Sequence, residues 1–250
     1  MRRVILSCSA TLNCGALRPA TTFDGTTPMT QKKSELPTQN TAPYYLAQPK
    51  SGKGKAILVL HAWWGLNSFF KDFCDRLAKE GFTVLAPDLY HGATAYTVAE
   101  AKRLRAKLKK ETVTKEIIAA AEYLRALCGA GKRGIGVVGF SLGGYWALWL
   151  AEQKPNLVAA TVALYATRNG DFAKSQAAVQ FHHAESDDYV AASGVKKLEK
   201  SLRAAGKDAE FHSYPSTTHW FFESDRADAY NVPAAQLAWK RTIAFLRKHT

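Results

Sequence analysis

From Lys55 onward, short runs of apolar residues alternate with longer segments whose apolar positions recur about every 3.6 residues. The short runs predict buried strands at residues 56–60, 82–86, 134–139, 157–164, 178–182 and 210–214. The longer segments predict helices at residues 69–79, 97–110, 115–128, 191–204 and 234–248, and one more that follows the strand at 134–139 and runs through Leu150. This alternation predicts an α/β fold, with a mostly parallel sheet covered by helices on both faces.

The N-terminal part of the chain lacks this pattern. Residues 1–43 are rich in Thr, Ser, Asn, Gln and Pro without a sustained hydrophobic period, which predicts a disordered or leader-like tail. The alternatives are a leader cleaved or lipidated at Cys8 or Cys14, and a true start at Met29. Neither a repeat nor a linker divides the remainder, so we expect residues 44–250 to form one domain.

Composition narrows the class of protein. Of 250 residues, 47% are hydrophobic and 22% charged, which is typical of globular proteins and excludes a disordered or fibrous chain. The longest apolar runs fall short of the roughly 18–20 residues that span a bilayer, so we expect no membrane span. The four cysteines form no C-x-x-C pair and are expected to be small buried side chains, without a metal or disulfide role. Sparse cysteines fit a reducing compartment, and the expected localisation is cytoplasmic.

A G-x-S-x-G pattern carries the strongest chemical signal, with Ser141 between Gly139 and Gly143. It lies between an apolar strand and an amphipathic helix, where a sharp turn holds the serine hydroxyl above the end of the sheet. The glycines let strand and helix approach closely, and the helix N-terminus favours developing negative charge. We therefore expect a nucleophilic serine here rather than a plain glycine-rich turn.

A nucleophilic serine needs a base and a carboxylate that orients the base, and in this fold class they follow the serine in the order acid, then histidine. His219 lies in the loop after the last predicted strand, which makes it the best candidate base. Spacing favours Asp187, just past the strand at 178–182, over Asp188 and Glu185 as the acid. The other histidines are expected within strands, at strand ends, in the tail or at the pocket rim: His182, His183, His212, His249, His61 and His91.

The loop at residues 61–67 follows the first predicted buried strand and contains Trp63, Trp64 and a glycine. An oxyanion hole combines a backbone N–H from such a loop with that of the residue after the nucleophile, here Leu142. Ligands of parallel sheets bind at the carboxyl ends of the strands. We therefore expect the tryptophans to be walls of a substrate pocket rather than core residues.

These segments together resemble the dienelactone hydrolase family of α/β-hydrolases. The resemblance runs from about Ala56 to Phe245 and rests on the residues at 58–67, Ala86-Pro87-Asp88-Leu89-Tyr90, the residues at 139–144, and the segment from Tyr214 to Phe222. It implies Ser141 as nucleophile, Asp187 as acid and His219 as base. It also implies oxyanion donors at the backbone of Trp63 and Leu142.

This chain departs from the family pattern at four positions. Well-known members have cysteine at the position of Ser141 and, at the position of Ala62, a glutamate associated with protonation of that thiol. The resemblance also implies substrate-binding arginines where this chain has Gly92 and Glu223. Losing the glutamate together with the thiol is chemically coherent. Without the arginines, we expect an uncharged substrate rather than dienelactone itself.

The expected pocket is apolar and suits an acyl or aryl group. Its predicted wall residues are Ala62, Trp64, Tyr90, His91, Phe140, Trp220 and Phe221. We expect hydrolysis of small uncharged esters or lactones through an acyl-serine intermediate, with no metal or cofactor. The alternatives are a peptidase or acyltransferase that uses the same residues, and a binding module without catalysis.

The formal net charge of +13 raises the question of a nucleic-acid partner. Many basic residues gather between Lys102 and Lys115, opposite the apolar positions Ala101, Leu104 and Leu108. That arrangement is typical of the solvated face of a core-packed helix, and no interleaved aromatics or nucleic-acid motif accompany it. We expect a small-molecule ester as the partner and no nucleic acid; the sequence leaves the oligomeric state open.

Overall fold

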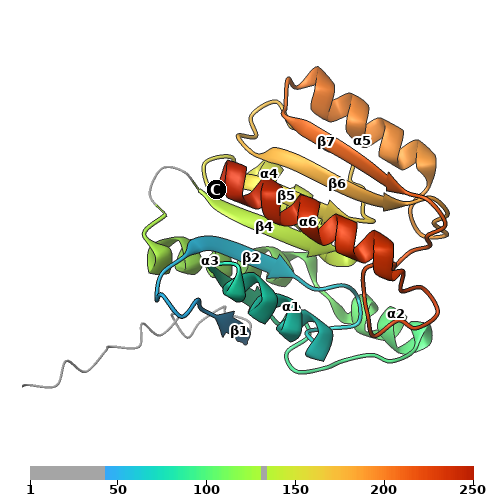
Figure 1. Cartoon of the computed structure of the whole chain (residues 1–250), viewed down its shortest axis with the longest axis horizontal. Coiled ribbons are helices and arrows are strands. Elements are labelled where there is room, and N and C mark those ends of the chain that lie inside the picture. Colours follow the sequence, from blue (N-terminus) through green and yellow to red (C-terminus); the bar gives the residue numbers. More distant parts are fainter. Residues whose placement is uncertain (1–42, 131–133) are drawn as a thin grey trace, which may run out of the picture. The chain divides into compact units, whose positions relative to one another are not determined.

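The computed structural model describes residues 43–130 and 134–250. Its seven-stranded sheet has the order β1-β3-β2-β4-β5-β6-β7, and every neighbouring pair is parallel except β1 with β3 (Figure 1). The strands are β1 (Tyr44–Ala47), β2 (Lys55–Leu60), β3 (Phe82–Pro87), β4 (Ile135–Phe140), β5 (Val158–Leu164), β6 (Ala178–Ala184) and β7 (Ala209–Tyr214). The expected α/β fold with a mostly parallel sheet is confirmed.

Helices cover both faces of this sheet. They are α1 (Ser68–Lys79), α2 (Val98–Lys107), α3 (Lys110–Cys128), α4 (Leu142–Gln153), α5 (Ala192–Ala204) and α6 (Val232–His249). Alternate residues of β2 show the two layers: Ile57 and Val59 share a core with α1 and α6, whereas Leu58 and Leu60 pack with α3 and α4. In Figure 1, α1 and α6 lie in front of the sheet. Because both faces are covered, the central strands are buried and continuously apolar.

Two features differ from the sequence-based expectation. The edge strand β1 was not expected; it is short and half-buried, so it lacks the continuous apolar run of a central strand. The expected helix at 97–110 ends at Lys107, and the next begins at Lys110 rather than Lys115. Leu108 is extended, with ψ 125°, and packs against the core beneath α3, so it breaks the helix.

The N-terminal predictions lie outside the described residues, apart from Pro43; this holds for Cys8, Cys14 and Met29 as well. The cysteines in the described part, Cys74 and Cys128, are free thiols, buried and half-buried respectively. The described helices include none with the length and hydropathy of a bilayer-spanning segment.

The parallel topology determines where the candidate site forms. Since β4, β6 and β7 run in the same direction, the residues that follow them emerge at the same edge of the sheet. Ser141 follows β4, Asp187 follows β6 and His219 follows β7.

Candidate active site

The turn that carries Ser141 is backbone-strained. Its φ of 50° and ψ of −110° are unfavourable for a residue with a side chain, and such strain persists only where the surrounding structure enforces it. A Cβ on Gly143 would overlap the carbonyl oxygen of Leu60, and one on Gly139 would overlap the backbone of Gly143. The tight crossing of β4 and α4 therefore requires glycine on both sides of the serine.

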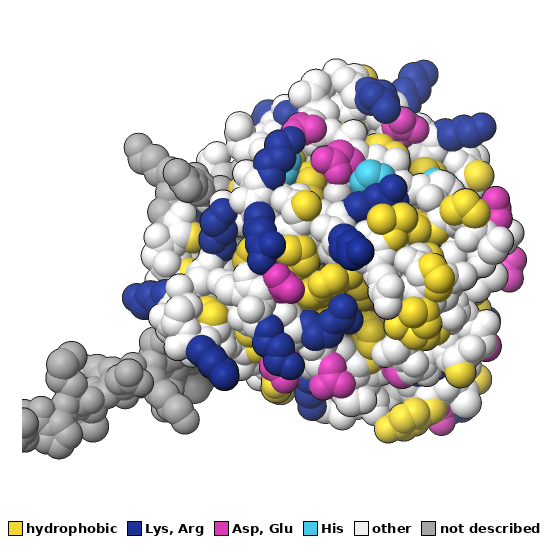
Figure 2. Space-filling view, viewed as in Figure 1, with side chains coloured by type: hydrophobic (Ala, Val, Ile, Leu, Met, Phe, Trp, Pro, Cys, Tyr) yellow, Lys and Arg dark blue, Asp and Glu magenta, His cyan; other side chains and the backbone are white. Residues whose placement is uncertain are grey.

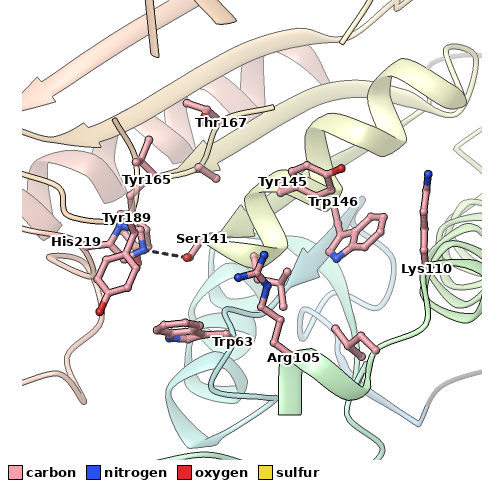
Figure 3. Close-up of a pocket in the computed structure, with 14 residues that line it drawn as sticks. Trp63, Arg105, Lys110, Ser141, Tyr145, Trp146, Tyr165, Thr167, Tyr189 and His219 are labelled. Atoms are coloured by element: carbon pink, nitrogen blue, oxygen red, sulfur yellow. Dashed lines mark hydrogen bonds between the residues drawn. The ribbon is translucent and has the colours of Figure 1, made fainter. Parts of the chain in front are cut away.

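A chain of hydrogen bonds links three side chains at this sheet edge, and Figure 3 shows its first member, the bond between Ser141 and His219. Ser141 Oγ lies 2.9 Å from His219 Nε2, and His219 Nδ1 lies 2.7 and 2.8 Å from the two carboxylate oxygens of Asp187. The Asp187 carboxylate accepts a hydrogen bond from Nδ1–H, which leaves Nε2 unprotonated and able to accept the serine proton. The side chains of His219 and Asp187 are only 4% and 5% exposed, so water competes little for these bonds.

Local hydrogen bonds hold the two loops that supply Asp187 and His219. Asp187 Oδ1 also accepts the backbone N–H groups of Tyr189 and Val190, each at 2.9 Å. The Glu185 carboxylate accepts the N–H of Ser216 at 2.8 Å, which ties the loop after β6 to the loop after β7. Glu185 thus has a bracing role, and Asp187 is the carboxylate that reaches the imidazole.

Three of the other described histidines have contacts away from Ser141. His182 is buried and contacts the hydroxyl of Tyr214 at 2.6 Å, and burial holds its pKa well below the usual value. His61 is buried, its Nε2 accepts the N–H of Leu89, and burial lowers its pKa. His91 pairs with Glu116 at 2.9 Å. None of these three lines the cavity at Ser141.

A cavity of about 440 Å³ opens beside Ser141. It is lined by Trp63, Arg105, Leu108, Lys110, Ser141, Leu142, Tyr145, Trp146, Tyr165, Ala166, Thr167, Tyr189, Val190 and His219. Figure 3 shows Ser141 between His219 and Tyr189 on one side and Arg105 and Trp146 on the other. Its size suits a small organic molecule.

The prediction that Phe140 is a wall of the pocket is wrong, because its side chain points into the core. Phe140 is fully buried among Phe69, Phe70, Phe73 and Phe222, on the face of the sheet opposite α4. Side chains of neighbouring strand residues point to opposite faces, so adjacency to Ser141 in the sequence does not bring this ring to the cavity.

Other predicted walls lie one layer behind the cavity or beside a different one. Trp64 and Trp220 pack on Trp63, which itself lines the cavity. Ala62 and Phe221 are fully buried. Tyr90 and His91 line a separate cavity of about 370 Å³ next to Glu116. Both Trp63 and Trp64 were expected to be walls of the pocket, but only Trp63 lines it.

Sequence analysis missed walls that come from three other places. Tyr165, Ala166 and Thr167 follow β5; Tyr145 and Trp146 lie in the first turns of α4; Tyr189 follows Asp187. Each of these segments follows the carboxyl end of a parallel strand, so the predicted strand order could have indicated that they border the site.

The basic segment contributes to the cavity, which was not expected. Arg105 of α2 and Lys110 of α3 are exposed, yet both line the cavity, whose described lining includes no carboxylate. Within the part of the chain that the structure describes, neither side chain forms an ion pair. Other Lys and Arg side chains are spread among Asp and Glu over the face with α1 and α6 (Figure 2). Both side chains are thus solvated, as expected, and they also border the cavity, which was not expected.

The residues proposed for an oxyanion hole both border the cavity. Leu142 is the first residue of α4, so its backbone N–H has no acceptor within the helix. Trp63 lies in the loop after β2 and also lines the cavity. Among the described residues there is no cluster of three His, Cys, Asp or Glu side chains suited to a metal.

Comparison with known proteins agrees with this fold and identifies a family. The model of the dienelactone hydrolase family matches residues 43–250. The "Putative carboxymethylenebutenolidase" of Aquifex aeolicus is 30% identical over 216 residues, covering 82% of this chain and 92% of that protein. The "Probable 2-oxo-3-(5-oxofuran-2-ylidene)propanoate lactonase" of a Bradyrhizobium species is 30% identical over 222 residues, covering 82% and 88%.

A solved structure gives the same result. The crystal structure of the "Putative Dienelactone Hydrolase" of Klebsiella pneumoniae superposes with a TM-score of 0.73 at 26% identity, covering 83% of this chain and 93% of that one. The range matched by the family model, residues 43–250, includes the segments that carry Ser141, Asp187 and His219. This chain belongs to the dienelactone hydrolase family, within the α/β-hydrolase fold.

Proposed function

We propose that the protein hydrolyses small carboxylic esters or lactones through an acyl-serine intermediate. The hydrogen-bonded chain Ser141–His219–Asp187 is the observation that carries this proposal. A serine hydroxyl is a weak nucleophile unless a neighbouring base removes its proton as it attacks. Here the base, its orienting carboxylate and a cavity for the substrate occur together.

The proposed reaction has two steps. In the first, Ser141 Oγ attacks the carbonyl carbon while its proton passes to His219 Nε2, and the oxyanion accepts hydrogen bonds from the backbone of Trp63 and Leu142. The C–O bond then breaks as His219 returns that proton to the departing alkoxide, which in a lactone stays tethered to the acyl group. In the second step, water attacks the acyl-serine and gives its proton to His219, which protonates Ser141 Oγ as the acid leaves.

The positive charge at the cavity supports the proposal that the substrate carries an acidic group. The expectation of an uncharged ester rested on Gly92 and Glu223, which replace the family's arginines. Arg105 and Lys110 bring positive charge to the cavity from a different segment of the chain, and they have no carboxylate partner among the described residues. The lactonase relative is named for a propanoate, which carries such a group. A carboxylate-bearing small ester or lactone is therefore our proposed substrate.

Turnover of an aryl acetate, an aryl butyrate and a γ-lactone by wild type and Ser141→Ala tests the reaction. We expect the variant to lose about 10³-fold or more in kcat, and one equivalent of a fluorophosphonate to label wild type but not the variant. Equal turnover by both proteins would overturn the proposal. Turnover confined to peptides, or acyl transfer in preference to hydrolysis, would favour the alternative reactions instead.

The substrate charge needs a separate comparison between an aryl hemiester of glutaric acid and its methyl ester. Arg105→Ala should lower kcat/KM roughly tenfold for the hemiester and little for the methyl ester, since a charge-assisted contact is lost only with the acid. Lys102→Ala is the matched control, because Lys102 is exposed on the same helix without lining the cavity. An equal effect of Arg105→Ala on both esters would contradict the acidic substrate and leave the reaction itself untouched.

A further inference from the structure

A buried carboxyl group lies behind the proposed base. Glu223 follows His219 by four positions in the chain, and its side chain is 0% exposed. Its Oε1 accepts a hydrogen bond of 2.6 Å from the hydroxyl of Tyr165, while Oε2 has no hydrogen-bond partner in the described part of the structure. Burying a carboxyl group with so few partners is costly. An apolar side chain at position 223 would fill the same space without that cost. The hydrogen bond between Glu223 and the Tyr165 hydroxyl therefore calls for an explanation.

Tyr165 connects this carboxyl group to the strand beside Ser141. It follows β5 directly, with φ 38°, and its N–H donates to the carbonyl of His182 at 2.7 Å. The carbonyl of the preceding residue, Leu164, accepts the N–H of Ser141 at 2.9 Å. The Tyr165–Glu223 hydrogen bond therefore joins the segment that carries His219 to the sheet position that holds Ser141.

Tyr165 also touches the imidazole itself. The ring centroids of Tyr165 and His219 are 4.9 Å apart, as are those of Tyr189 and His219. Tyr189 is 48% exposed, whereas Tyr165 is 0% exposed and held at its hydroxyl. The hydrogen bonds at Nδ1 and Nε2 leave the imidazole free to tilt about the line between those two nitrogens. The indole of Trp220, the next residue in the chain, also contacts the imidazole, with ring centroids 5.0 Å apart. Tyr165 is the fully buried ring that reaches His219 from another segment, and it limits this tilt from that side.

We propose that Glu223 is a positioning residue: through the hydroxyl of Tyr165 it holds that ring against His219 and keeps Nε2 directed at Ser141. The inference rests on the proposed hydrolase function. It assigns a role to the position where family resemblance implies a substrate-binding arginine, and that role does not involve contact with substrate.

The contact does not require a charge on Glu223. Burial raises the pKa of Glu223 to about 8, so most of its carboxyl groups are protonated at pH 7. The groups that face it are Tyr165, Asp225, Arg226 and the indole of Trp64; among them Asp225 raises the pKa further, while the other three lower it. A glutamine presents the same carbonyl oxygen to the tyrosine hydroxyl, so Glu223→Gln should preserve the contact.

The test compares kcat and KM for an aryl acetate among wild type and four variants. We expect Glu223→Leu and Tyr165→Phe each to lower kcat about tenfold with KM changed less than about twofold, because imidazole orientation matters in the chemical step. The double variant should be no slower than Glu223→Leu, since both changes remove one contact. Glu223→Gln should restore kcat to within about threefold of wild type.

Matched controls separate this role from a general effect of buried polar groups. Glu116→Gln changes another buried glutamate that has an unpartnered oxygen. Tyr214→Phe removes another buried tyrosine hydroxyl, which bonds to His182. Both should keep kcat near wild type. If Glu223→Leu does not fold, Tyr165→Phe still decides the matter.

Wild-type kcat in Tyr165→Phe, or a Glu223→Gln variant as slow as Glu223→Leu, would overturn the inference. In either case an inactive Ser141→Ala would show that the proposed reaction still stands. Turnover that survives in Ser141→Ala is the distinct result that would remove the proposed function itself.

Discussion

The buried carboxyl group of Glu223 makes the stability of the protein depend on pH in a specific direction. Its pKa is raised by burial from 4.5 to about 8 in the folded state. The folded state therefore holds this proton more tightly than the unfolded state does. The stabilisation from that proton is complete below pH 4.5, falls as the pH rises, and is gone above about pH 8.

Replacing Glu223 by glutamine removes this titration. Since one pKa unit corresponds to about 1.4 kcal/mol, the free energy of unfolding of Glu223→Gln should rise relative to wild type by roughly 4 kcal/mol between pH 5 and pH 9. A constant offset from the new amide is expected at every pH and does not affect this difference. His182 and His61, whose pKa values burial lowers, destabilise both proteins equally in acid.

Urea unfolding of both proteins at pH 5, 7 and 9, followed by tryptophan fluorescence, measures the difference directly. Equal m values at each pH are needed for the comparison. Glu116→Gln provides the control for a less perturbed buried acid: burial raises its pKa, but its His91 partner opposes the shift. A wild-type-to-Glu223→Gln difference that is the same at pH 5 and pH 9 would refute the reasoning.

Three further changes test separate features of the site. Asp187→Asn should lower kcat about 10³–10⁴-fold with little change in KM, because the imidazole loses the carboxylate that sets its tautomer; a change of less than tenfold in steady-state assays would count against it. Gly143→Ala should cost at least about 1–3 kcal/mol in urea unfolding, since the methyl group overlaps the carbonyl of Leu60, and an unchanged midpoint would contradict that collision. Phe140→Leu should lower the melting temperature while KM stays near wild type, because this ring packs in the core. A changed KM with an unchanged melting temperature would instead indicate that Phe140 is a wall of the pocket.

Sequence predicted best the features that depend on local backbone geometry and strand order. The turn at Ser141 is recognisable because the close approach of β4 and α4 excludes side chains at Gly139 and Gly143. Asp187 and His219 were predicted because parallel strands deliver their following loops to one edge. Spacing favoured Asp187 over Asp188 without excluding Asp188, and the family resemblance was needed to settle that choice.

The cavity walls were predicted poorly because they depend on side-chain direction. Phe140 directly precedes Ser141, yet its ring lies on the other face of the sheet. Tyr165 has the positive φ of a strained turn, which no pattern of apolar residues indicates. Arg105 has the spacing of a surface residue, and its place beside the cavity depends on how α2 packs in the folded protein. These positions follow from tertiary packing, which a single sequence does not display.

The serine at residue 141 has a consequence for resistance to oxidation. A thiolate nucleophile is readily converted by peroxide to sulfenic and then sulfinic acid, whereas a hydroxyl group is not. In the described part of the chain, burial raises the pKa values of the Cys74 and Cys128 thiols, so neither offers much thiolate near neutral pH. Turnover by this chain should therefore persist in peroxide or iodoacetamide at doses that inactivate relatives with a cysteine in the same turn.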